Sequence, residues 1–562
     1  DLWENKTLLI VTNHLPLITS SPTFVGFLFV GRWVDLDISK GINIDFKMHL
    51  ISFILLIFIL GCNQKEYNTP PNILICIADD AGHMGKDYAW VQTPAFDRVA
   101  NEGLLFENAY TPNAKCAPSR ASLLTARNSW QLKEAANHFN NFPAEYKTYP
   151  EVLKEFGYFT GYTGKGWGPG NPGEINGKKR ELCGSGWNSK KIEPLTKKMS
   201  HNDYSENFKD FFNNKPHGKP FYFWYGGWEP HRGFEYGSSL KAGKKLSDIK
   251  KVPAFFPDNN IVRTDILDYA LEIEYFDSHV TKILDFLESK GELENTIVIV
   301  TSDHGMPFPR AKSDEYDYSN HIPLAIMWGD NIKDPGREID EYVSFIDIAP
   351  TFFEAVGIKW EQSGMQGTPG TSLIPFFKGE NENFRNYVLI GKERHDVGRP
   401  NDYGYPIRGI VKDGWMYLRN YRPDLWPAAN PECGYSTVDG SPTKTEVLKS
   451  RHNSETKFYW DLSFGKRPAE ELFYLPDDKF CIENLAFEEK FYSIKDELIF
   501  KMEEELKKQA DPRMIGDGDI FHSYYFTSNK YRNLYSRMVN EGEKIVPVWI
   551  NASDIETDLM GE

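Results

Sequence analysis

Three aspartates of this sequence stand directly after apolar runs. Asp79 and Asp80 follow one such run, and Asp303, with His304 beside it, follows another. In a parallel sheet the carboxyl ends of the strands share one edge, so we expect the three carboxylates to converge there. Hard oxygen donors without cysteine and with little histidine suit Ca²⁺ better than Zn²⁺. An isolated Asp pair more often forms a turn or caps a helix. Because Asp303 and His304 are expected at the same edge of the sheet as Asp79 and Asp80, a metal site is favoured over that alternative.

A second chemical feature is the stretch 116–120, which reads Cys-Ala-Pro-Ser-Arg. Proline suits the first turn of a helix, so Pro118 places Cys116 where a loop enters a helix. The free N–H groups at such a helix start attract an anion, and Arg120, one turn further on, adds a positive charge. The alternative is a buried or free cysteine near a helix start, with Arg120 in a surface ion pair.

Short apolar runs are predicted to be the buried strands that position these groups. Runs that are apolar on both faces are typical of a mainly parallel sheet covered by helices. A helical pattern at 266–287 alternates with them, and Gly291 ends it. This alternation predicts an α/β fold. The four predicted strands are 73–78, 221–225, 296–301 and 324–328.

The Cys-x-Pro-Ser-Arg stretch, followed by small and apolar residues, resembles the signature of the type I sulfatases. In that family a maturation enzyme oxidises the cysteine to formylglycine, whose hydrate carries two hydroxyls on one carbon. One hydroxyl attacks sulfur and the other later expels the sulfate. The resemblance extends from about residue 72 to residue 508. It is nearest to the heparan N-sulfatase (sulfamidase) branch, on the matches at 229–232 and 303–309 and a weaker one at 138–140.

The resemblance implies an alkaline-phosphatase-like sulfatase fold. This is an α/β fold with a large mixed, mainly parallel sheet flanked by helices, plus a smaller C-terminal α+β domain with a short antiparallel sheet. We expect the catalytic sulfatase domain at 71–375 and the smaller domain, which contributes substrate contacts, at 376–562. The glycine-rich stretch 361–370 is predicted to be a connecting loop, and 492–509 a terminal helix.

By the same resemblance the metal is Ca²⁺. Its implied ligands are Asp79, Asp80, Asp303, the formylglycine at Cys116, and His304, which stands where the family has Asn or His. Nitrogen ligation of calcium is unusual, and it leaves room for another divalent ion.

The resemblance also implies the catalytic cations. Arg120 would hold the gem-diol or its alkoxide, Lys165 and Lys312 would bind the sulfate, and His231 would contact the sulfate and protonate the leaving group. Each match is weak alone, because most lysines are solvated and a lone histidine is usually structural. Many sulfatases carry a histidine two residues after the first lysine, and here that position is Trp167. The base for sulfate release is therefore unassigned, and Trp167 either stacks on a sugar ring or belongs to the core.

A polar cluster follows the strand predicted at 387–390 in the smaller domain. Such a cluster can bind a carboxylated, sulfated sugar, because arginine pairs with a carboxylate through two hydrogen bonds. The alternative is an ordinary solvated loop. The candidate sugar contacts are Trp167, Arg232, Glu393, Arg394, His395 and Arg408, with Arg399 and Tyr405 near them in the sequence.

The N-terminal segment has the features of an export signal. The first methionine is Met48, and the apolar run 50–60 has the length of a signal-peptide core but is too short to span a membrane, which takes about 20 residues. The run ends in Leu-Gly-Cys, which resembles a bacterial lipobox with Cys62 lipidated, and the residues after it resemble an outer-membrane tag. The alternative is an unprocessed, partly buried helix. We expect 1–47 to be untranslated or removed, 48–61 to be a lipoprotein signal peptide and 62–70 to be a tether.

The predicted location is therefore an outer-membrane lipoprotein that faces the cell surface or the periplasm. The net charge of −16 argues against non-specific nucleic-acid binding, which needs a basic surface. Cys76 is predicted to be a core residue. Cys433 and Cys481 could pair after export, although the sequence does not establish the connectivity, and Cys183 is unassigned.

Together these features predict a calcium-dependent sulfatase that acts on sulfate esters of a sulfated polysaccharide or its oligosaccharides. Its expected partners are that glycan, the formylglycine maturation enzyme and the outer membrane. An O-sulfate of an algal ulvan-type glycan is preferred, and heparan N-sulfoglucosamine is the alternative. The rival functions are a phosphate or phosphonate ester hydrolase of the same superfamily and a non-catalytic glycan-binding lipoprotein.

Overall fold

The computed structural model describes residues 70–85, 88, 90–380 and 384–558. The predicted signal segment 48–61 and Cys62 lie outside these residues. Residues 67–562 form one compact unit, and the predicted domain boundary near residue 375 lies inside it. Among the described residues, no helix is both long and apolar enough to cross a membrane.

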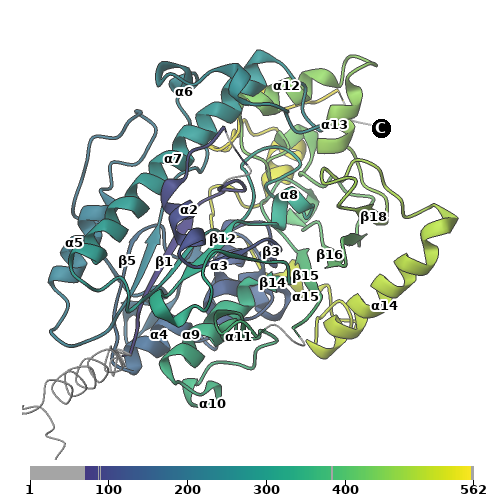
Figure 1. The fold of residues 1–562 in the computed structure, drawn as a ribbon. Coiled ribbons are helices and arrows are strands. Elements are labelled where there is room, and N and C mark those ends of the chain that lie inside the picture. The colour runs from purple at the N-terminus through teal and green to yellow at the C-terminus, as the bar shows by residue number, and fades with distance from the viewer. Residues whose placement is uncertain (1–69, 86–87, 89, 381–383, 559–562) are drawn as a thin grey trace, which may run out of the picture. The chain divides into compact units, whose positions relative to one another are not determined.

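The centre of the fold is an eight-stranded sheet (Figure 1). All neighbouring strands in it are parallel except the two pairs that involve β12, which runs antiparallel to β11 and β2. The prediction of a mixed, mainly parallel sheet is confirmed. In sheet order the strands are β13 (Arg337–Ile339), β2 (Leu104–Phe106), β12 (Leu324–Met327), β11 (Thr296–Ser302), β1 (Asn72–Ala78), β10 (Phe221–Gly226), β5 (Phe159–Gly164) and β9 (Ser185–Gly186).

Helices cover both faces of this sheet, which explains why its central strands are apolar on both sides. In β1, Leu74 and Cys76 belong to one buried core, while Ile73 and Ile75 belong to the other, because successive side chains of a strand point to opposite faces. The first core is covered by α2 (Pro94–Asn101), α5 (Tyr204–Asn213) and α7 (Asn260–Ser289), and the second by α3 (Cys116–Thr125), α4 (Tyr149–Glu155) and α9 (Ile348–Val356).

Helix α7 is longer at both ends than the predicted 266–287. It begins after Asn259, whose side-chain oxygen accepts hydrogen bonds from the backbone N–H groups of Ile261 and Val262. This is a side-chain cap that satisfies free N–H groups of the first turn. The apolar stripe from Ile266 to Leu287 is buried against the sheet.

The C-terminal part of the chain holds a four-stranded antiparallel sheet, as predicted. Asp413 and Gly414, both at positive φ, form the two-residue turn between its two middle strands. Helix α14 (Tyr492–Lys508) packs Leu498 and Met502 on one face of the sheet. The strands are β15 (Tyr387–Lys392), β16 (Ile407–Lys412), β17 (Trp415–Asn420) and β18 (Glu470–Tyr474).

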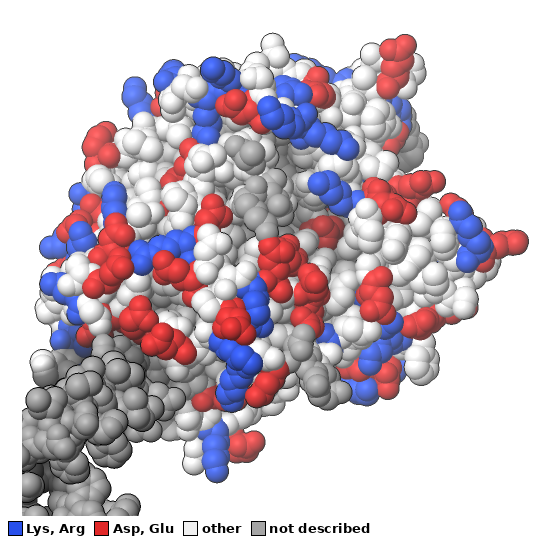
Figure 2. Space-filling model, in the orientation of Figure 1, with Lys and Arg blue, Asp and Glu red and all other residues white. Residues whose placement is uncertain are grey.

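The remaining elements are short, and α12 packs on α7. They are β3 (Ala109–Tyr110), β4 (Asn140–Asn141), β6 (Gly170–Asn171), β7 (Glu174–Ile175), β8 (Lys178–Lys179), β14 (Val343–Ser344), α6 (Ser238–Lys241), α8 (Asp317–Asn320), α10 (Trp360–Ser363), α11 (Ile374–Phe377), α12 (Pro442–Ser450), α13 (Lys457–Phe464) and α15 (Ile520–Ser523). Figure 2 shows acidic and basic side chains interspersed on one face of the molecule.

The cysteines of the described residues are free and buried. Cys76 lies in the core, as predicted. The possible pair of Cys433 and Cys481 is not formed, because the two thiols belong to separate hydrophobic clusters. Cys183 is buried in the core on the α3 side of the sheet.

Candidate active site

Asp79, Asp80 and Asp303 converge at the carboxyl edge of the sheet. They follow β1 and β11, which are neighbours with Ala78 opposite Ser302. Asp80 has a φ of 76°, a left-handed conformation that breaks the strand alternation, so that consecutive carboxylates turn to the same place. Each of the three residues offers an oxygen within 4.8 Å of the others, and all three are fully buried.

Each of these aspartates has its own cationic neighbour. Lys165 Nζ donates to both carboxylate oxygens of Asp79, at 2.6 and 2.7 Å. Arg120 Nε donates to Asp303 Oδ2 at 2.8 Å, and Lys312 Nζ donates to an oxygen of Asp80 at 2.7 Å. The cluster thus brings together three acids and three of the predicted catalytic cations.

These contacts set the protonation of the acids. Burial would raise the pKa of Asp80, but Lys312 and His304 hold it well below its usual range. Burial likewise acts against the ionised form of Asp303, and Arg120 with His304 lowers its pKa below the usual range. The three buried carboxyl groups together form the hard oxygen donor set that a Ca²⁺ ion requires. The residues present therefore fit the predicted metal.

Cys116 is the first residue of α3, where an extended Lys115 leads into the helix, as expected. Its Sγ lies 3.4 Å from His304 Nε2 and 3.8 Å from Asp80 Oδ1. Burial, and next the charge of Asp79, raise the pKa of the Cys116 thiol. A neutral thiol is a poor nucleophile, so the unmodified side chain is not activated for attack.

His304 bridges the metal-ligand cluster and the cysteine. Its Nε2 lies 2.9 Å from Asp80 Oδ1, and its Nδ1 lies 3.0 Å from the carbonyl oxygen of Gly305. Burial disfavours its charged form, but Asp303 and Asp80 raise the pKa of His304 overall. The predicted ligand set of Asp79, Asp80, Asp303, Cys116 and His304 therefore lies in one place.

His231 closes the solvent side of the cluster. Its Nε2 lies 3.1 Å from Lys312 Nζ, and its side chain is 34% exposed, whereas Lys312 is buried. Lys312 Nζ also donates to Asp439 at 2.7 Å. Asp439 was not predicted from the sequence, since it belongs to no motif and lies 127 positions away from Lys312.

Trp167 lies beside the start of α3. Its Nε1 donates to the carbonyl oxygen of Ala117 at 3.0 Å, and its ring meets Phe142 edge-on. Trp167 thus braces the helix that carries Cys116. Arg232 donates to both carboxylate oxygens of Asp265, at 2.5 and 2.9 Å, so its guanidinium is already paired.

The predicted sugar contacts of the smaller domain are buried in the protein. Arg408 pairs with Asp511, at 2.7 and 3.0 Å, and with Glu393 at 2.8 Å. Arg513 occupies the remaining side of Glu393. Because protein partners satisfy these charges, the structure gives no support to a sugar contact by Arg408 or Glu393. Neither is the region a solvated loop.

Neighbouring members of that cluster are also used internally. Arg394 donates to the carbonyl oxygen of Tyr524, and His395 Nε2 lies 2.8 Å from Asn113 Oδ1. Arg399 and Tyr405 are likewise buried, and Arg399 donates to backbone carbonyl oxygens.

Ion pairs that were not predicted from the sequence connect the loop after β15 to the start of α3. Asp396 lies 2.8 Å from Lys115 Nζ and 2.9 Å from His138 Nδ1. Residue 138 belongs to the weak match at 138–140, and this motif was the only signal in the sequence for the contact. These ion pairs hold Lys115, the residue that precedes Cys116, in place.

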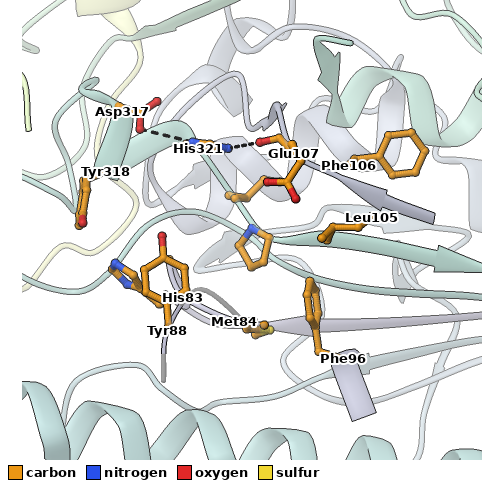
Figure 3. A pocket seen from close by; sticks show the side chains of 14 residues that line it. His83, Met84, Tyr88, Phe96, Leu105, Phe106, Glu107, Asp317, Tyr318 and His321 are labelled. Carbon is orange, nitrogen blue, oxygen red and sulfur yellow. Dashed lines mark hydrogen bonds and ion pairs between the residues drawn. The ribbon is translucent and has the colours of Figure 1, made fainter. Parts of the chain in front are cut away.

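Several cavities lie near this part of the fold, and two of them differ in the residues that line them. One, of about 320 Å³, is lined by His231 and Trp228 among others. The other, of about 190 Å³, is lined by residues such as His83, Phe96 and His321 (Figure 3). Because the second cavity includes none of the predicted catalytic residues, the cavity beside His231 is the one that adjoins the cluster.

Comparisons with known proteins agree with this geometry. A family model described as "Sulfatase" matches residues 71–358, more than half of the 562-residue chain. The chain is 28% identical to N-sulphoglucosamine sulphohydrolase of Homo sapiens over 475 residues, covering 78% of this chain and 89% of that protein. It is also 28% identical to an ulvan-active sulfatase of Formosa agariphila over 467 residues, covering 79% and 82%.

The fold also matches solved structures. One is a structure in complex with its substrate, D-glucosamine-2-N,6-O-disulfate, which aligns with a TM-score of 0.54 at 18% identity. The alignment covers 79% of this chain and 99% of that chain. At this identity the likeness supports the fold.

Proposed function

This chain belongs to the sulfatase family, and from that premise we propose that it hydrolyses sulfate esters of a sulfated polysaccharide or its oligosaccharides, with Ca²⁺ and a formylglycine formed from Cys116. The observation that carries the proposal is the convergence of a helix-start cysteine, three buried aspartates and buried cations on one point. That arrangement is suited to an anionic group whose charge grows during reaction.

The cations have distinct positions around Cys116. Lys165 and Arg120 lie on the buried side, and Lys312 with His231 lies toward the solvent. The N-terminal N–H groups of α3 add a partial positive charge at the same point. A sulfate held there would be surrounded by positive charge, with its ester oxygen toward His231.

Asp79, Asp80 and Asp303 would hold the metal through their carboxylate oxygens, and His304 would join them only as a neutral imidazole, after the metal displaces the proton from its Nε2. A bound Ca²⁺ supplies positive charge that polarises the sulfate. Oxidation of Cys116 to formylglycine supplies, in the hydrate, a nucleophilic hydroxyl and a second hydroxyl that lets the sulfate leave.

His231 is the residue placed to protonate the leaving sugar oxygen. Its side chain is partly exposed, and the cavity next to it can hold the sugar. General acid catalysis by a positioned histidine is worth ~10²–10⁴-fold in rate.

The substrate class is proposed from the chemistry and from the relatives. The name of the human relative gives N-sulphoglucosamine as its substrate, and the name of the Formosa agariphila relative gives ulvan. We propose an O-sulfate of an ulvan-type glycan as the first substrate to test and N-sulfoglucosamine as the second. We also propose lipidation at Cys62 and an outer-membrane location, which rest on the sequence motif alone.

The experiment is sulfate release from a panel of heparan, chondroitin, ulvan, carrageenan and fucoidan oligosaccharides. The protein is produced with a formylglycine maturation enzyme, and mass spectrometry tests for an aldehyde at position 116. We expect sulfate release and an aldehyde. Faster cleavage of an aryl phosphate than of an aryl sulfate would favour the phosphate-ester rival. If the protein carries the aldehyde and binds a glycan but releases no sulfate from it, the non-catalytic glycan-binding function would be favoured.

A further inference from the structure

The cavity beside His231 reaches the edge of the proposed sulfate site. Its volume of about 320 Å³ lies at the lower end of the range of ligand pockets, about 300–1,000 Å³. Lys312 Nζ lies 3.1 Å from the His231 side chain, and Lys165 Nζ lies 5.7 Å from the ring centre of Trp228. The cavity walls therefore touch two of the cations proposed to bind sulfate.

Trp228 is an aromatic wall of this cavity that remains open to solvent. Its side chain is 47% exposed, although the preceding strand β10 is fully buried. Its backbone N–H donates to Tyr204 Oη at 3.1 Å, which holds the loop in place. A rigid, exposed indole next to a polar site offers a flat apolar face at little entropic cost.

Glu272, on α7, is a buried carboxyl in the wall of the same cavity. It is only 3% exposed, and its carboxyl group has no hydrogen-bond or ion-pair partner among the residues that the structure describes. Burial, together with the nearby Glu229 and Asp268, raises the pKa of Glu272 well above its usual range. The Glu272 oxygens are not among the fully buried side-chain atoms that lack a partner, so they are open to the cavity and can accept hydrogen bonds from a ligand there.

The neighbouring carboxyl shows the contrast. Glu229 lines the cavity too, but it accepts hydrogen bonds from the backbone N–H of Ser200 and from Tyr204 Oη, both at 2.7 Å. Its hydrogen-bonding capacity is used within the protein. Glu272 is the carboxyl of the two whose capacity is left for a ligand.

We propose that this cavity binds the sugar ring that carries the sulfate, with the ring stacked on Trp228 and a hydroxyl or amino group of the sugar donating to Glu272. The inference rests on the proposed sulfatase function and adds the residues that select the sugar. A hydrogen-bond donor of the sugar suits the Glu272 carboxyl, which accepts a hydrogen bond from no protein group among the described residues. The preferred ring therefore presents an uncharged hydroxyl or an amino group toward α7.

The test compares kcat/KM for two kinds of substrate in two variants. Ulvan oligosaccharides and N-sulfoglucosamine serve as sugar sulfates, and 4-nitrophenyl sulfate serves as an aromatic sulfate without hydroxyls. Glu272→Gln keeps the shape of the side chain, and we expect its loss on the sugar sulfate to exceed its loss on nitrophenyl sulfate at least about tenfold. Trp228→Ala removes the stacking surface for both, and we expect KM to rise about 5- to 100-fold, with partial rescue by Trp228→Phe.

Two controls match these variants. Glu288→Gln changes an exposed carboxyl on the same helix α7, and Phe500→Ala removes an exposed aromatic ring on α14. Both should keep wild-type kinetics. Thermal unfolding checks each variant, and Glu272→Gln tests the cavity independently if Trp228→Ala fails to fold.

The outcomes separate the two levels of the proposal. If the wild type cleaves sugar sulfates while Glu272→Gln and Trp228→Ala both keep wild-type KM and kcat on them, the sugar site is wrong and the sulfatase proposal stands. An aldehyde-bearing wild type that releases sulfate from no ester, nitrophenyl sulfate included, would overturn both.

Discussion

Two buried clusters of charged side chains stand within this molecule, one around Cys116 and one around Arg408. In the first, the aspartates that follow β1 and β11 and cations from several segments converge on one point, and His231 lies on its solvent side. In the second, Arg408 and Arg513 share Glu393, and Asp511 completes the pairing. A charge whose partners are all protein groups holds the fold together. Charges that converge beside a cavity remain able to bind a ligand.

The comparison also separates the energetic roles of the two clusters. Removing one partner of a buried ion pair leaves an uncompensated charge and is strongly destabilising. At the Cys116 cluster a substitution should instead act mainly on catalysis, because a metal and a sulfate are proposed to share its charges. The predictions that follow test this division, from the largest expected effect to the smallest.

Cys116→Ser should abolish turnover when the maturation enzyme accepts only cysteine. A serine hydroxyl can in principle attack sulfur, but its ester has no second hydroxyl on the same carbon to expel the sulfate. Multiple-turnover sulfate release is measured together with mass spectrometry of the peptide. Full activity without an aldehyde would contradict the formylglycine proposal.

Asp303→Asn and Asp79→Ala should each remove both bound calcium and activity. Losing a carboxylate weakens the hold of the site on a hard cation, and the remaining acids then repel each other. Metal content is measured by elemental analysis, and activity is measured after chelation and after return of calcium. Wild-type kcat without bound calcium would show that the metal assignment is wrong.

His231→Ala should cost sugar-sulfate cleavage ~10²–10⁴-fold in kcat/KM and cost nitrophenyl sulfate much less. A sugar alkoxide is a poor leaving group and needs the proton, whereas nitrophenolate leaves without it. The comparison holds if sulfur–oxygen cleavage limits both reactions. Equal losses would mean that His231 only holds the sulfate, and Lys312 and His304 would become the candidates for the acid.

Arg408→Met should lower the free energy of unfolding by about 3–5 kcal/mol, because Asp511 and Glu393 lose their buried partner. The kcat of the folded fraction should stay within the range of the wild type. Chemical denaturation measures the first quantity, and sulfate release below the unfolding transition measures the second. Arg419→Met, which breaks a partly exposed pair with Glu503, should cost only about 0–1 kcal/mol. If Arg408→Met raises KM for glycans but not for nitrophenyl sulfate, the prediction that Arg408 contacts the sugar would be supported.

Among the substitutions at the Cys116 cluster, Asp439→Asn should have the smallest effect on catalysis, about 10- to 100-fold in kcat/KM. Asp439 positions Lys312 through one hydrogen bond to a charged group, which is worth about 1.5–3 kcal/mol. The loss should fall on sugar and nitrophenyl sulfates alike, since Lys312 is proposed to bind the sulfate itself. Unchanged kinetics on both substrates would show that Lys312 keeps its place without Asp439.

Much of the fold was predictable because its signals are local. The apolar runs of β1, β10 and β11 identified buried strands, and the stripe of α7 identified its helix. The direction of β12 was not predictable, since a strand buried on both faces has the same pattern in either orientation.

The sequence by itself determined the residues of the Cys116 cluster, because each follows a strand, starts a helix or stands in a recognisable motif. Only the tertiary structure decided which charged side chains pair with other protein groups. Arg408 meets Asp511 across 103 positions, and Lys312 meets Asp439 across 127. Neither spacing leaves a local pattern. The exposure of Trp228 and the unpaired carboxyl of Glu272 are likewise properties of packing between distant segments, which residue type alone cannot express.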